Sequence, residues 1–382
     1  MIPECIGALS LGVWIYLIFA RGGFWRLKFD DLPAAATVTP GKRIAVIVPA
    51  RNEAPTVANT INSLLRQEYP GVVQVYLVDD HSSDGTAERA GEAAVQAGRI
   101  DRLTIVVAEP LPDGWTGKLW ALSEGITAAT QFNPDYYWFT DADIVHEPEV
   151  LRDLLTHAEI TSLDLASLMV KLRCESFAEK MLIPAFVFFF FKLYPPAWVA
   201  SSRTRTAAAA GGCILIRANA LERIGGIAKI RDQLIDDCAL AREVKQSGGK
   251  LWLGTGKQSR SLRTYESFSE VGRMIARTAF TQLSHSALLL CGVVLAMVII
   301  YVVPIALLGT GKAAALLGAC AWILMMIAYA PTLRLYRLSP LWALLLPFTA
   351  IFYVGATLAS ALQYWTGRGG SWKGRLQDLA RT

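Results

Sequence analysis

The sequence predicts an α/β domain with a doubly wound, parallel sheet, joined to several transmembrane helices. Short apolar stretches rich in β-branched and aromatic residues alternate with stretches of helical periodicity, a pattern typical of parallel strands linked by right-handed crossovers. Polar clusters follow these apolar stretches, where the ligand sites of such sheets lie. In addition, 53% of the 382 residues are hydrophobic and only 18% are charged, which is too apolar for an ordinary soluble enzyme of this length.

Residues 2–20 form an apolar run just long enough to cross a bilayer. Basic residues follow this run instead of preceding it, namely Arg21, Arg26, Lys28, Lys42 and Arg43. A cleaved signal peptide carries its positive charges before the apolar region, so we interpret residues 1–22 as a retained membrane anchor. Because basic residues concentrate on the cytoplasmic flank, the N-terminus is predicted to lie outside and the following domain in the cytoplasm.

Residues 42–260 have the composition of a globular domain. The predicted buried strands and two of the helices between them are Ile44–Val48, Thr56–Gln67, Val75–Val78, Thr86–Ala97, Thr104–Val107 and Tyr137–Thr140. No Gly-x-Gly-x-x-Gly follows the first strand, which disfavours a dinucleotide-binding oxidoreductase.

Within this domain, residues 181–205 include an aromatic stretch, Met181–Ala200, that is interrupted by three prolines and Lys192. These interruptions disfavour a spanning helix. We expect a helix in the membrane interface, with Arg203 and Arg205 at headgroup level. A buried core helix of the globular domain remains an equal alternative.

The C-terminal third is predicted to contain a membrane-proximal helix at 261–285, three transmembrane helices within 286–365 and a basic tail at 366–382. The three spans are Ser286–Gly309, Ala313–Thr332 and Leu341–Trp365. Counting spans from a cytoplasmic domain places the tail outside, whereas its basic residues favour the inside. Either one segment is re-entrant or charge near the first helix dominates.

The charge balance favours membranes over nucleic acid as the partner. Lys and Arg number 37 and Asp and Glu 32, which gives a net charge of +5, and no basic run with interleaved aromatic residues occurs. Such a mild excess suits anionic lipid surfaces. The six cysteines lack Cys-x-x-Cys spacing and there are only four histidines, so we expect neither a disulfide frame nor a His-rich metal centre.

Two polar clusters follow the first two predicted strands. They are Pro49-Ala50-Arg51-Asn52-Glu53 and the segment from Asp79-Asp80 to Thr86. Carboxylates there can accept hydrogen bonds from a base or from ribose hydroxyls, and a helix N-terminus suits phosphate. Ordinary turns leading into a capped helix explain the same residues without a ligand.

Asp141 and Asp143 follow the aromatic strand Tyr137–Thr140. A turn could aim both carboxylates at one ion, and hard oxygen ligands suit Mg²⁺ or Mn²⁺ that already carries a phosphorylated substrate. The alternative is a loop whose Asp residues cap the helix predicted to begin near Pro148.

Taken together and in order, these motifs resemble those of the family 2 glycosyltransferases, which have the Rossmann-like GT-A fold of nucleotide-diphospho-sugar transferases. The series is P-A-R-N-E, D-D-H-S-S-D-G-T, W-T-G-K-L-W-A-L, D-A-D, G-G-C-I-L-I-R and I-D-D-C-A-L. This resemblance covers about residues 42–285. The membrane segments and the G-W-T-G-K-L-W stretch at 114–120 are similar to those of the hopene-associated glycosyltransferases of hopanoid-producing bacteria.

The resemblance implies a UDP-sugar donor. Asp80, with Asp79 beside it, would hold the uracil or the ribose. Pro49, Arg51 and Glu53 would lie on the same wall of the nucleotide-sugar site.

Asp143, supported by Asp141, would bind a Mg²⁺ or Mn²⁺ ion that bridges the two phosphates of the leaving group. His146 would either add a ligand or stabilise the loop, and we favour the second. Lys118, near two tryptophans, would reach a phosphate or a sugar hydroxyl. The alternative is a solvated lysine at a helix start.

The acceptor side is implied by two later motifs. Gly211 and Gly212 would lie at the acceptor's reactive end, although a bulge or turn explains them equally well. Asp237 corresponds to the general base of an inverting transfer, and Asp236 would support it. Acids at a helix N-terminus also need no catalytic explanation, and the family has Glu where this chain has Asp236.

Arg277 is the one residue of Met274-Ile275-Ala276-Arg277-Thr278 that fits the Gln-x-x-Arg-Trp motif of processive relatives. With Arg273 it would clamp the diphosphate or serve only as an inner-leaflet anchor. The missing Trp disfavours polysaccharide synthesis.

We therefore predict a multi-pass protein of the bacterial inner membrane, with its catalytic domain in the cytoplasm, that transfers a sugar from a UDP-sugar to a lipid hydroxyl. The resemblance implies a hopanoid-related acceptor. The alternatives are a polyprenyl-phosphate glycosyltransferase, a nucleotidyltransferase on a similar fold and a noncatalytic membrane protein.

Overall fold

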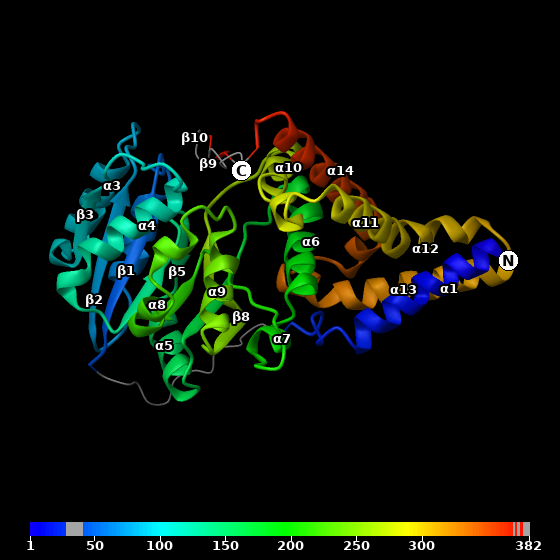
Figure 1. Ribbon diagram of the computed structural model, residues 1–382, viewed down its shortest axis with the longest axis horizontal. Helices are drawn as coiled ribbons and strands as arrows, with labels where there is room; N and C mark the ends of the chain where they lie inside the picture. Colours follow the sequence, from blue (N-terminus) through cyan, green and yellow to red (C-terminus); the bar gives the residue numbers. More distant parts are fainter. Residues whose placement is uncertain (28–40, 370, 373–374, 377–382) are drawn as a thin grey trace. The chain divides into compact units, whose positions relative to one another are not determined.

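The computed structural model describes residues 1–27 and 41–369, together with the backbone of residues 371–372 and 375–376. The chain forms two compact units (Figure 1). The helical unit comprises Met1–Leu27, Arg173–Ala197 and Thr264–Gly370, and the sheet unit comprises Lys28–Leu172, Trp198–Arg263 and Ser371–Thr382. Lys28 of the predicted basic flank, and Lys373 and Arg381 of the predicted basic tail, lie outside the described residues.

An eight-stranded sheet forms the centre of the sheet unit, in the order β3-β2-β1-β4-β7-β6-β8-β5. Its strands are β1 Arg43–Ala50, β2 Val72–Asp79, β3 Leu103–Val107, β4 Tyr136–Phe139, β5 Ile144–His146, β6 Leu165–Lys171, β7 Ile214–Arg217 and β8 Leu251–Ser261. The first four correspond to the predicted strands and are mutually parallel.

The sheet as a whole is mixed: the four predicted strands are parallel, as expected, and strands later in the chain add antiparallel pairs. β7 runs antiparallel to both β4 and β6, and β5 runs antiparallel to β8. Apolar periodicity indicates that a strand is buried but carries no information about its direction. The return strand β7 enters the sheet after the long excursion of residues 173–197 into the helical unit, which local sequence does not reveal.

Helices connect the strands of this sheet, as the alternating pattern predicts. They are α2 Val57–Leu65, α3 Thr86–Gln96, α4 Gly117–Ala128, α5 Val150–Ile160, α8 Ala218–Arg223 and α9 Asp236–Gln246, with short 3-10 turns η1 Ile100–Arg102, η2 Thr130–Phe132 and η3 Ile227–Ile230. α2 and α3 confirm the two predicted helices.

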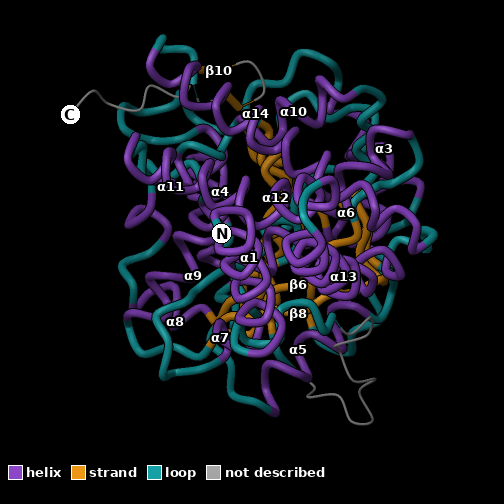
Figure 2. The backbone as a smooth tube through the Cα atoms, turned by 90° about the vertical axis from the view of Figure 1, so that its right-hand side faces the viewer, coloured by secondary structure: helices purple, strands orange, loops and turns teal. Residues whose placement is uncertain are grey.

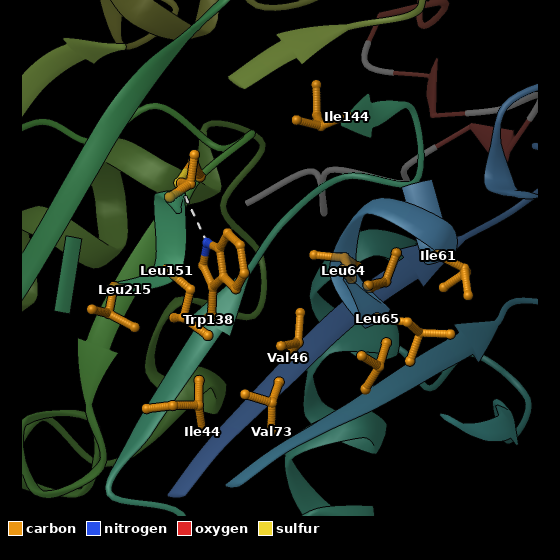
Figure 3. Close-up of a cluster of buried hydrophobic side chains, with 14 of the residues drawn as sticks. Ile44, Val46, Ile61, Leu64, Leu65, Val73, Trp138, Ile144, Leu151 and Leu215 are labelled. Atoms are coloured by element: carbon orange, nitrogen blue, oxygen red, sulfur yellow. Dashed lines mark hydrogen bonds between the residues drawn. The ribbon is translucent and has the colours of Figure 1, made fainter. Parts of the chain in front are cut away.

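Trp138 of β4 lies at the centre of the core of the sheet unit (Figure 3). The side chain is fully buried, and its Nε1 donates a hydrogen bond to Cys213 Sγ at 3.3 Å. Ile44, Val46 and Leu215 surround it from neighbouring strands. Burial of such a large side chain stabilises the fold by about 2–3 kcal/mol, and here it holds the strand that leads into Asp141.

The helical unit contains α1 Ile2–Phe19, α6 Phe177–Leu193, α10 Phe268–Ala276, α11 Ala287–Met297, α12 Val303–Ala306, α13 Lys312–Leu335 and α14 Leu346–Trp365, with the π-helical turn η5 Val298–Val302 and the 3-10 turns η4 Thr281–Leu283, η6 Leu307–Gly309 and η7 Pro340–Leu345. α7 Pro196–Ala200 follows α6. Among the described residues, five stretches are long and apolar enough to cross a membrane, namely Ile2–Phe19, Phe177–Ala200, Ala287–Gly309, Lys312–Leu335 and Pro340–Trp365. These stretches indicate membrane association.

Helix α6 differs from the sequence prediction in two respects. It continues through Pro184 but ends at Leu193, before Pro195 and Pro196, and α7 begins at Pro196. The combined stretch Phe177–Ala200 is nevertheless long and apolar enough to span, which the sequence did not predict. It also packs against α10, α13 and α14 within the helical unit, so the alternative of a core helix of the globular domain is wrong. In Figure 1, α6 runs across the direction of α13, and its location in the membrane interface stays a prediction.

Helix α1 packs along α13, and the two lie side by side in both Figures 1 and 2. Its polar side chains find partners in the π-helical turn: Ser10 Oγ donates to Ile299 O and Trp14 Nε1 donates to Ile300 O, both at 2.8 Å. Irregular turns leave carbonyl oxygens free to accept such bonds.

At the C-terminus, β9 Ser371–Trp372 pairs with β10 Arg375–Leu376.

Candidate active site

Lys118 joins two of the predicted acidic motifs. It lies in the first turn of α4, which Thr116 caps by accepting a hydrogen bond from the Leu119 N–H at 3.4 Å. Its Nζ is 2.9 Å from Asp141 Oδ1 and 3.2 Å from Asp236 Oδ2. Burial opposes the charged form, but these two carboxylates outweigh it and raise the pKa of Lys118 above its ordinary value. The two carboxylates therefore favour the charged ammonium form of Lys118.

Asp237 lies beside this ion-pair cluster at the start of α9. Its Oδ2 accepts a hydrogen bond from the Gly211 N–H at 2.9 Å, and its Oδ1 accepts one from the Cys238 N–H at 2.7 Å. Burial and the charge of Asp236 raise the pKa of Asp237 to about 6, although Lys118 and the two N–H donors oppose the shift. The carboxylate is thus a stronger base than an ordinary aspartate.

Gly211 and Gly212 precede β7 and differ in what surrounds them. A Cβ at 211 would lie 3.2 Å from Lys118 Nζ and 3.4 Å from Asp237 Oδ2, whereas a Cβ at 212 would lie 3.0 Å from Val170 Cγ2. The first glycine therefore borders the charged cluster and the second borders the core of the sheet.

Substituting alanine at each glycine should separate activity from stability. Gly211→Ala places a methyl group against the ammonium and should lower the transfer rate by about 10- to 100-fold with little change in thermal unfolding. Gly212→Ala meets the stiff, β-branched Val170 and should cost about 1–3 kcal/mol of stability. Transfer rates and melting curves of both variants test this difference, and equal melting temperatures for the two would contradict it.

Arg263 forms a second ion-pair cluster that the sequence did not predict. Its Nε is 2.7 Å from Asp143 Oδ2 and its Nη2 is 2.8 Å from Glu53 Oε1. The Asp143 backbone carbonyl also accepts a hydrogen bond from the Leu262 N–H at 2.8 Å. The structure therefore places Glu53 and Asp143 around one guanidinium, whereas Asp141 belongs to the Lys118 cluster.

The first two polar clusters meet at the ends of β1 and β2, as predicted. The Arg51 guanidinium donates to the backbone carbonyl of Asp80 and is 3.4 Å from its Oδ2. The Asp80 side chain is only 1% exposed. Asp79 Oδ1 accepts a hydrogen bond from the Ser82 N–H at 3.2 Å, and the Glu53 N–H donates to Thr86 Oγ1 at 2.9 Å.

His146 is a structural residue in this arrangement. Its ring nitrogens lie 2.9 Å from Thr140 Oγ1 and 2.8 Å from Ser259 Oγ. Thr140 Oγ1 donates to the Gly212 carbonyl, so we assign Nε2–H as the donor to Thr140 and Nδ1 as the acceptor from Ser259. Burial lowers the pKa of His146 to about 3. A neutral ring with both nitrogens engaged stabilises the loop and is not a cation ligand.

A small pocket brings six of the thirteen predicted site residues together. Its polar lining includes Lys118, Asp141, Asp236 and Asp237, and Pro49 and Gly211 complete that side. Apart from Thr140, the remainder of its lining is apolar. Arg277 is not among the lining residues of this pocket. It belongs to the helical unit, where it is an exposed residue at the C-terminal end of α10.

Comparison with known proteins decides the family. The family model described as "Glycosyltransferase like family 2" matches residues 40–281, which is more than half of the chain. The chain belongs to glycosyltransferase family 2.

Individual relatives of this glycosyltransferase are distant. A probable glycosyltransferase YdaM of Bacillus subtilis (strain 168) is 27% identical over 153 residues, and the matched region spans about a third of each chain, 36% of this one and 32% of the relative. The mannosyltransferase PcManGT from Pyrobaculum calidifontis, solved with GDP-Man and Mn²⁺, aligns with a TM-score of 0.60 at 18% identity over 94% of this chain and 99% of that one. The likeness shows a shared GT-A fold that extends through the apolar helices.

A lower similarity is found to glucosyl-3-phosphoglycerate synthase from Mycobacterium tuberculosis, solved with Mg²⁺ and uridine-diphosphate. It aligns with a TM-score of 0.42 at 18% identity, covering 64% of this chain and 79% of that one.

The donor atoms of this glycosyltransferase fit a divalent cation that is shared with a substrate. Among the described residues, no three His, Cys, Asp or Glu side chains gather into an all-protein cation site. Mg²⁺ in phosphate chemistry takes one or two carboxylates, and phosphate oxygens and water fill its remaining positions. Asp141 and Asp143 are two hard oxygen ligands on one turn after β4, but their carboxylates pair with Lys118 and with Arg263 respectively, so a cation held by both stays a prediction.

Proposed function

We propose that this glycosyltransferase transfers a sugar, with inversion, from a UDP-sugar to a hydroxyl group of a membrane lipid. One observation carries the proposal: the Lys118 ammonium pairs with both Asp141 and Asp236. Asp141, one of the two proposed cation ligands, therefore lies in the same pocket as Asp237. The raised pKa of Asp237 suits a general base. A donor-side group and a proton acceptor therefore share one pocket.

In the proposed reaction, Asp237 accepts the proton of the acceptor hydroxyl as its oxygen attacks the anomeric carbon. The bond from that carbon to the diphosphate oxygen breaks, and UDP leaves with the bonding electron pair. Attack and departure on opposite faces invert the configuration, through an oxocarbenium-like transition state. The Gly211 N–H, which donates to Asp237 Oδ2, orients the carboxylate for this step.

The donor half is assigned to the other acids. Asp80 and Asp79 would bind the uracil or the ribose, with Pro49, Arg51 and Glu53 on the same wall. Asp143 and Asp141 would hold Mg²⁺ or Mn²⁺, which when bound neutralises charge on the departing diphosphate. Arg263 pairs with both Asp143 and Glu53, so it connects the proposed cation ligand to the proposed nucleotide-binding residues.

The acceptor is proposed from the helical unit. Five stretches that can cross a membrane surround the sheet segments in the sequence, which suits a substrate whose tail stays in the bilayer. We place the protein in the bacterial inner membrane with the sheet unit in the cytoplasm. A hopanoid-related acceptor rests on the sequence resemblance alone, and Arg277 as a diphosphate clamp remains part of the proposal.

A polyprenyl phosphate is the second candidate acceptor. Its nucleophile is already anionic and needs little base, so the two acceptors differ in their dependence on Asp237. The Pyrobaculum calidifontis mannosyltransferase was solved in complex with GDP-Man, which makes GDP-mannose the donor to test beside UDP-sugars.

The decisive experiment incubates membranes that contain the full chain with radiolabelled UDP-sugars or GDP-mannose, extracted lipids and Mg²⁺ or Mn²⁺. We expect label in the lipid phase, lost on chelation and lowered by at least about 100-fold in Asp143→Ala. Asp113→Ala, which changes an exposed acid of the sheet unit, is the matched control. Unlabelled lipid with every donor, or equal labelling by Asp143→Ala, would refute the proposal.

A further inference from the structure

Lys192, near the C-terminal end of α6, has no acidic partner in the helical unit. Its Nζ donates a hydrogen bond to Tyr301 Oη at 2.8 Å. It also lies 5.0 Å from the ring centroid of Phe189 and 4.8 Å from that of Tyr301. Within residues 1–27 and 41–369, no carboxylate forms an ion pair with it. A tyrosine hydroxyl and aromatic faces stabilise an ammonium but do not neutralise its charge.

The acids of the helical unit lie too far from Lys192 to neutralise its positive charge. The unit has five, namely Glu4, Glu175, Glu179, Glu266 and Glu270. Glu179 lies 13 residues before Lys192 on the same helix, about 20 Å away at 1.5 Å per residue, and it accepts hydrogen bonds from the N–H groups of Ser176 and Tyr265. Glu266 directly follows Tyr265, Glu270 lies in the first turn of α10, and Glu4 lies in the first turn of α1.

A second cation is fixed beside Lys192. The Arg21 guanidinium donates to the backbone carbonyls of Lys192 at 3.1 Å and Leu193 at 3.3 Å, which caps the negative end of α6. Arg21 directly follows the apolar helix α1 and Ala20. Basic residues in that position mark the level of lipid headgroups, so the end of α6 is held at the level where lipid phosphates lie.

Buried aromatic side chains surround Lys192 on its inner side. Tyr301, in the π-helical turn η5, is fully buried and packs edge-on against Trp14 and Phe189, with ring centroids 5.7 and 5.5 Å apart. Phe189 in turn packs against Tyr353 at 4.8 Å. These buried aromatic side chains hold the Lys192 side chain in place, and two cations at headgroup level match the phosphate of an anionic lipid.

We propose that Lys192 and Arg21, which are both partly exposed, form a binding site for the phosphate of an anionic phospholipid. The lipid phosphate supplies the negative charge that the described acids of the helical unit do not supply to Lys192. The inference rests on the membrane location proposed above, but it does not depend on the sugar-transfer reaction.

The test uses the full-length protein purified in a neutral detergent, without any nucleotide sugar. Phosphatidylglycerol should raise its melting temperature by a few degrees through binding to the folded state, whereas phosphatidylcholine and inorganic phosphate should not. Native mass spectrometry should count retained phosphatidylglycerol on the same samples.

Variants of one helix separate charge from packing. Lys192→Met and Lys192→Gln should both lose the phosphatidylglycerol shift and the retained lipid, and Lys192→Arg should keep them. Lys180→Met, at the other end of α6, should respond as the wild type does. An undiminished shift in Lys192→Gln, an equal shift with phosphatidylcholine, or stabilisation by inorganic phosphate alone would overturn the proposal. None of these measurements involves sugar transfer, so failure here is distinguishable from failure of the proposed function.

Discussion

Replacement of Asp237 by asparagine should lower the rate of sugar transfer to a hydroxyl acceptor by about 10²- to 10⁴-fold without lowering stability near pH 7.5. The amide can still accept the hydrogen bond from the Gly211 N–H, but it cannot take a proton. It also removes a carboxylate whose charged form is disfavoured by burial and by Asp236. Transfer assays and melting curves on the same preparations test both parts.

The pH dependence of the wild type provides an independent check on Asp237. Because the pKa of this carboxyl is raised to about 6, kcat/KM should fall as the pH drops below about 6. The stability of the fold should change with pH in the opposite direction to the rate. Because the pKa is higher in the folded state, this carboxyl stabilises the fold fully below its ordinary pKa, and that contribution is lost as the pH rises through about 6. A profile that stays flat down to pH 4.5 would exclude Asp237 as the base.

Asp232→Asn is the matched control, because Asp232 is an exposed acid five residues earlier and should leave rate and stability unchanged. A mild effect of Asp237→Asn would favour the polyprenyl-phosphate acceptor, whose nucleophile needs no base.

Lys118→Met should be the most damaging substitution for the pocket as a whole. It removes the cation that lies between Asp141 and Asp236 and leaves the carboxylates repelling one another. Because the lysine side chain is 19% exposed, we expect a loss of about 2 kcal/mol, below the range for a fully buried pair. The acid limb of the rate profile should also move to higher pH, because Lys118 lowers the pKa of Asp237.

Three further variants define what Lys118 contributes. Lys118→Arg keeps the charge and should recover most of the stability, and adding Asp141→Asn to Lys118→Met should restore part of it by removing one of the repelling charges. Lys229→Met, at an exposed position on η3, should have no effect. Chemical denaturation measures all four, and a Lys118→Met protein as stable as the wild type would show that the ion pairs contribute nothing.

The sequence predicted the residues that gather at strand ends and helix starts. Asp141 follows a buried aromatic strand and Asp236 begins an amphipathic helix, and both patterns are local. Because the carboxyl ends of parallel strands share one sheet edge, neighbouring motifs such as those at Asp80 and Glu53 were expected to meet.

Two features were out of reach of that reasoning. Arg263 pairs with Glu53 across 210 residues and with Asp143 across 120, and no periodicity marks an arginine at the end of β8 for such a contact. The one signal in the sequence is that Arg263 lies two residues after the long strand β8, in the kind of position where polar site residues occur. The reversed direction of β7 depends on the route of the chain through the helical unit, which is a property of the tertiary structure.

The bonds between α1 and the π-helical turn have a consequence for biosynthesis. Trp14 and its acceptor carbonyl at Ile300 are 286 residues apart. At roughly 5–20 residues per second, a ribosome that has added Trp14 needs about 15–60 s more to add Ile300. During that interval the indole N–H of a newly inserted helix has no native partner in the bilayer. A nascent chain that stalls or is truncated before residue 300 should therefore leave α1 accessible to membrane quality-control proteases, however completely the sheet unit has folded.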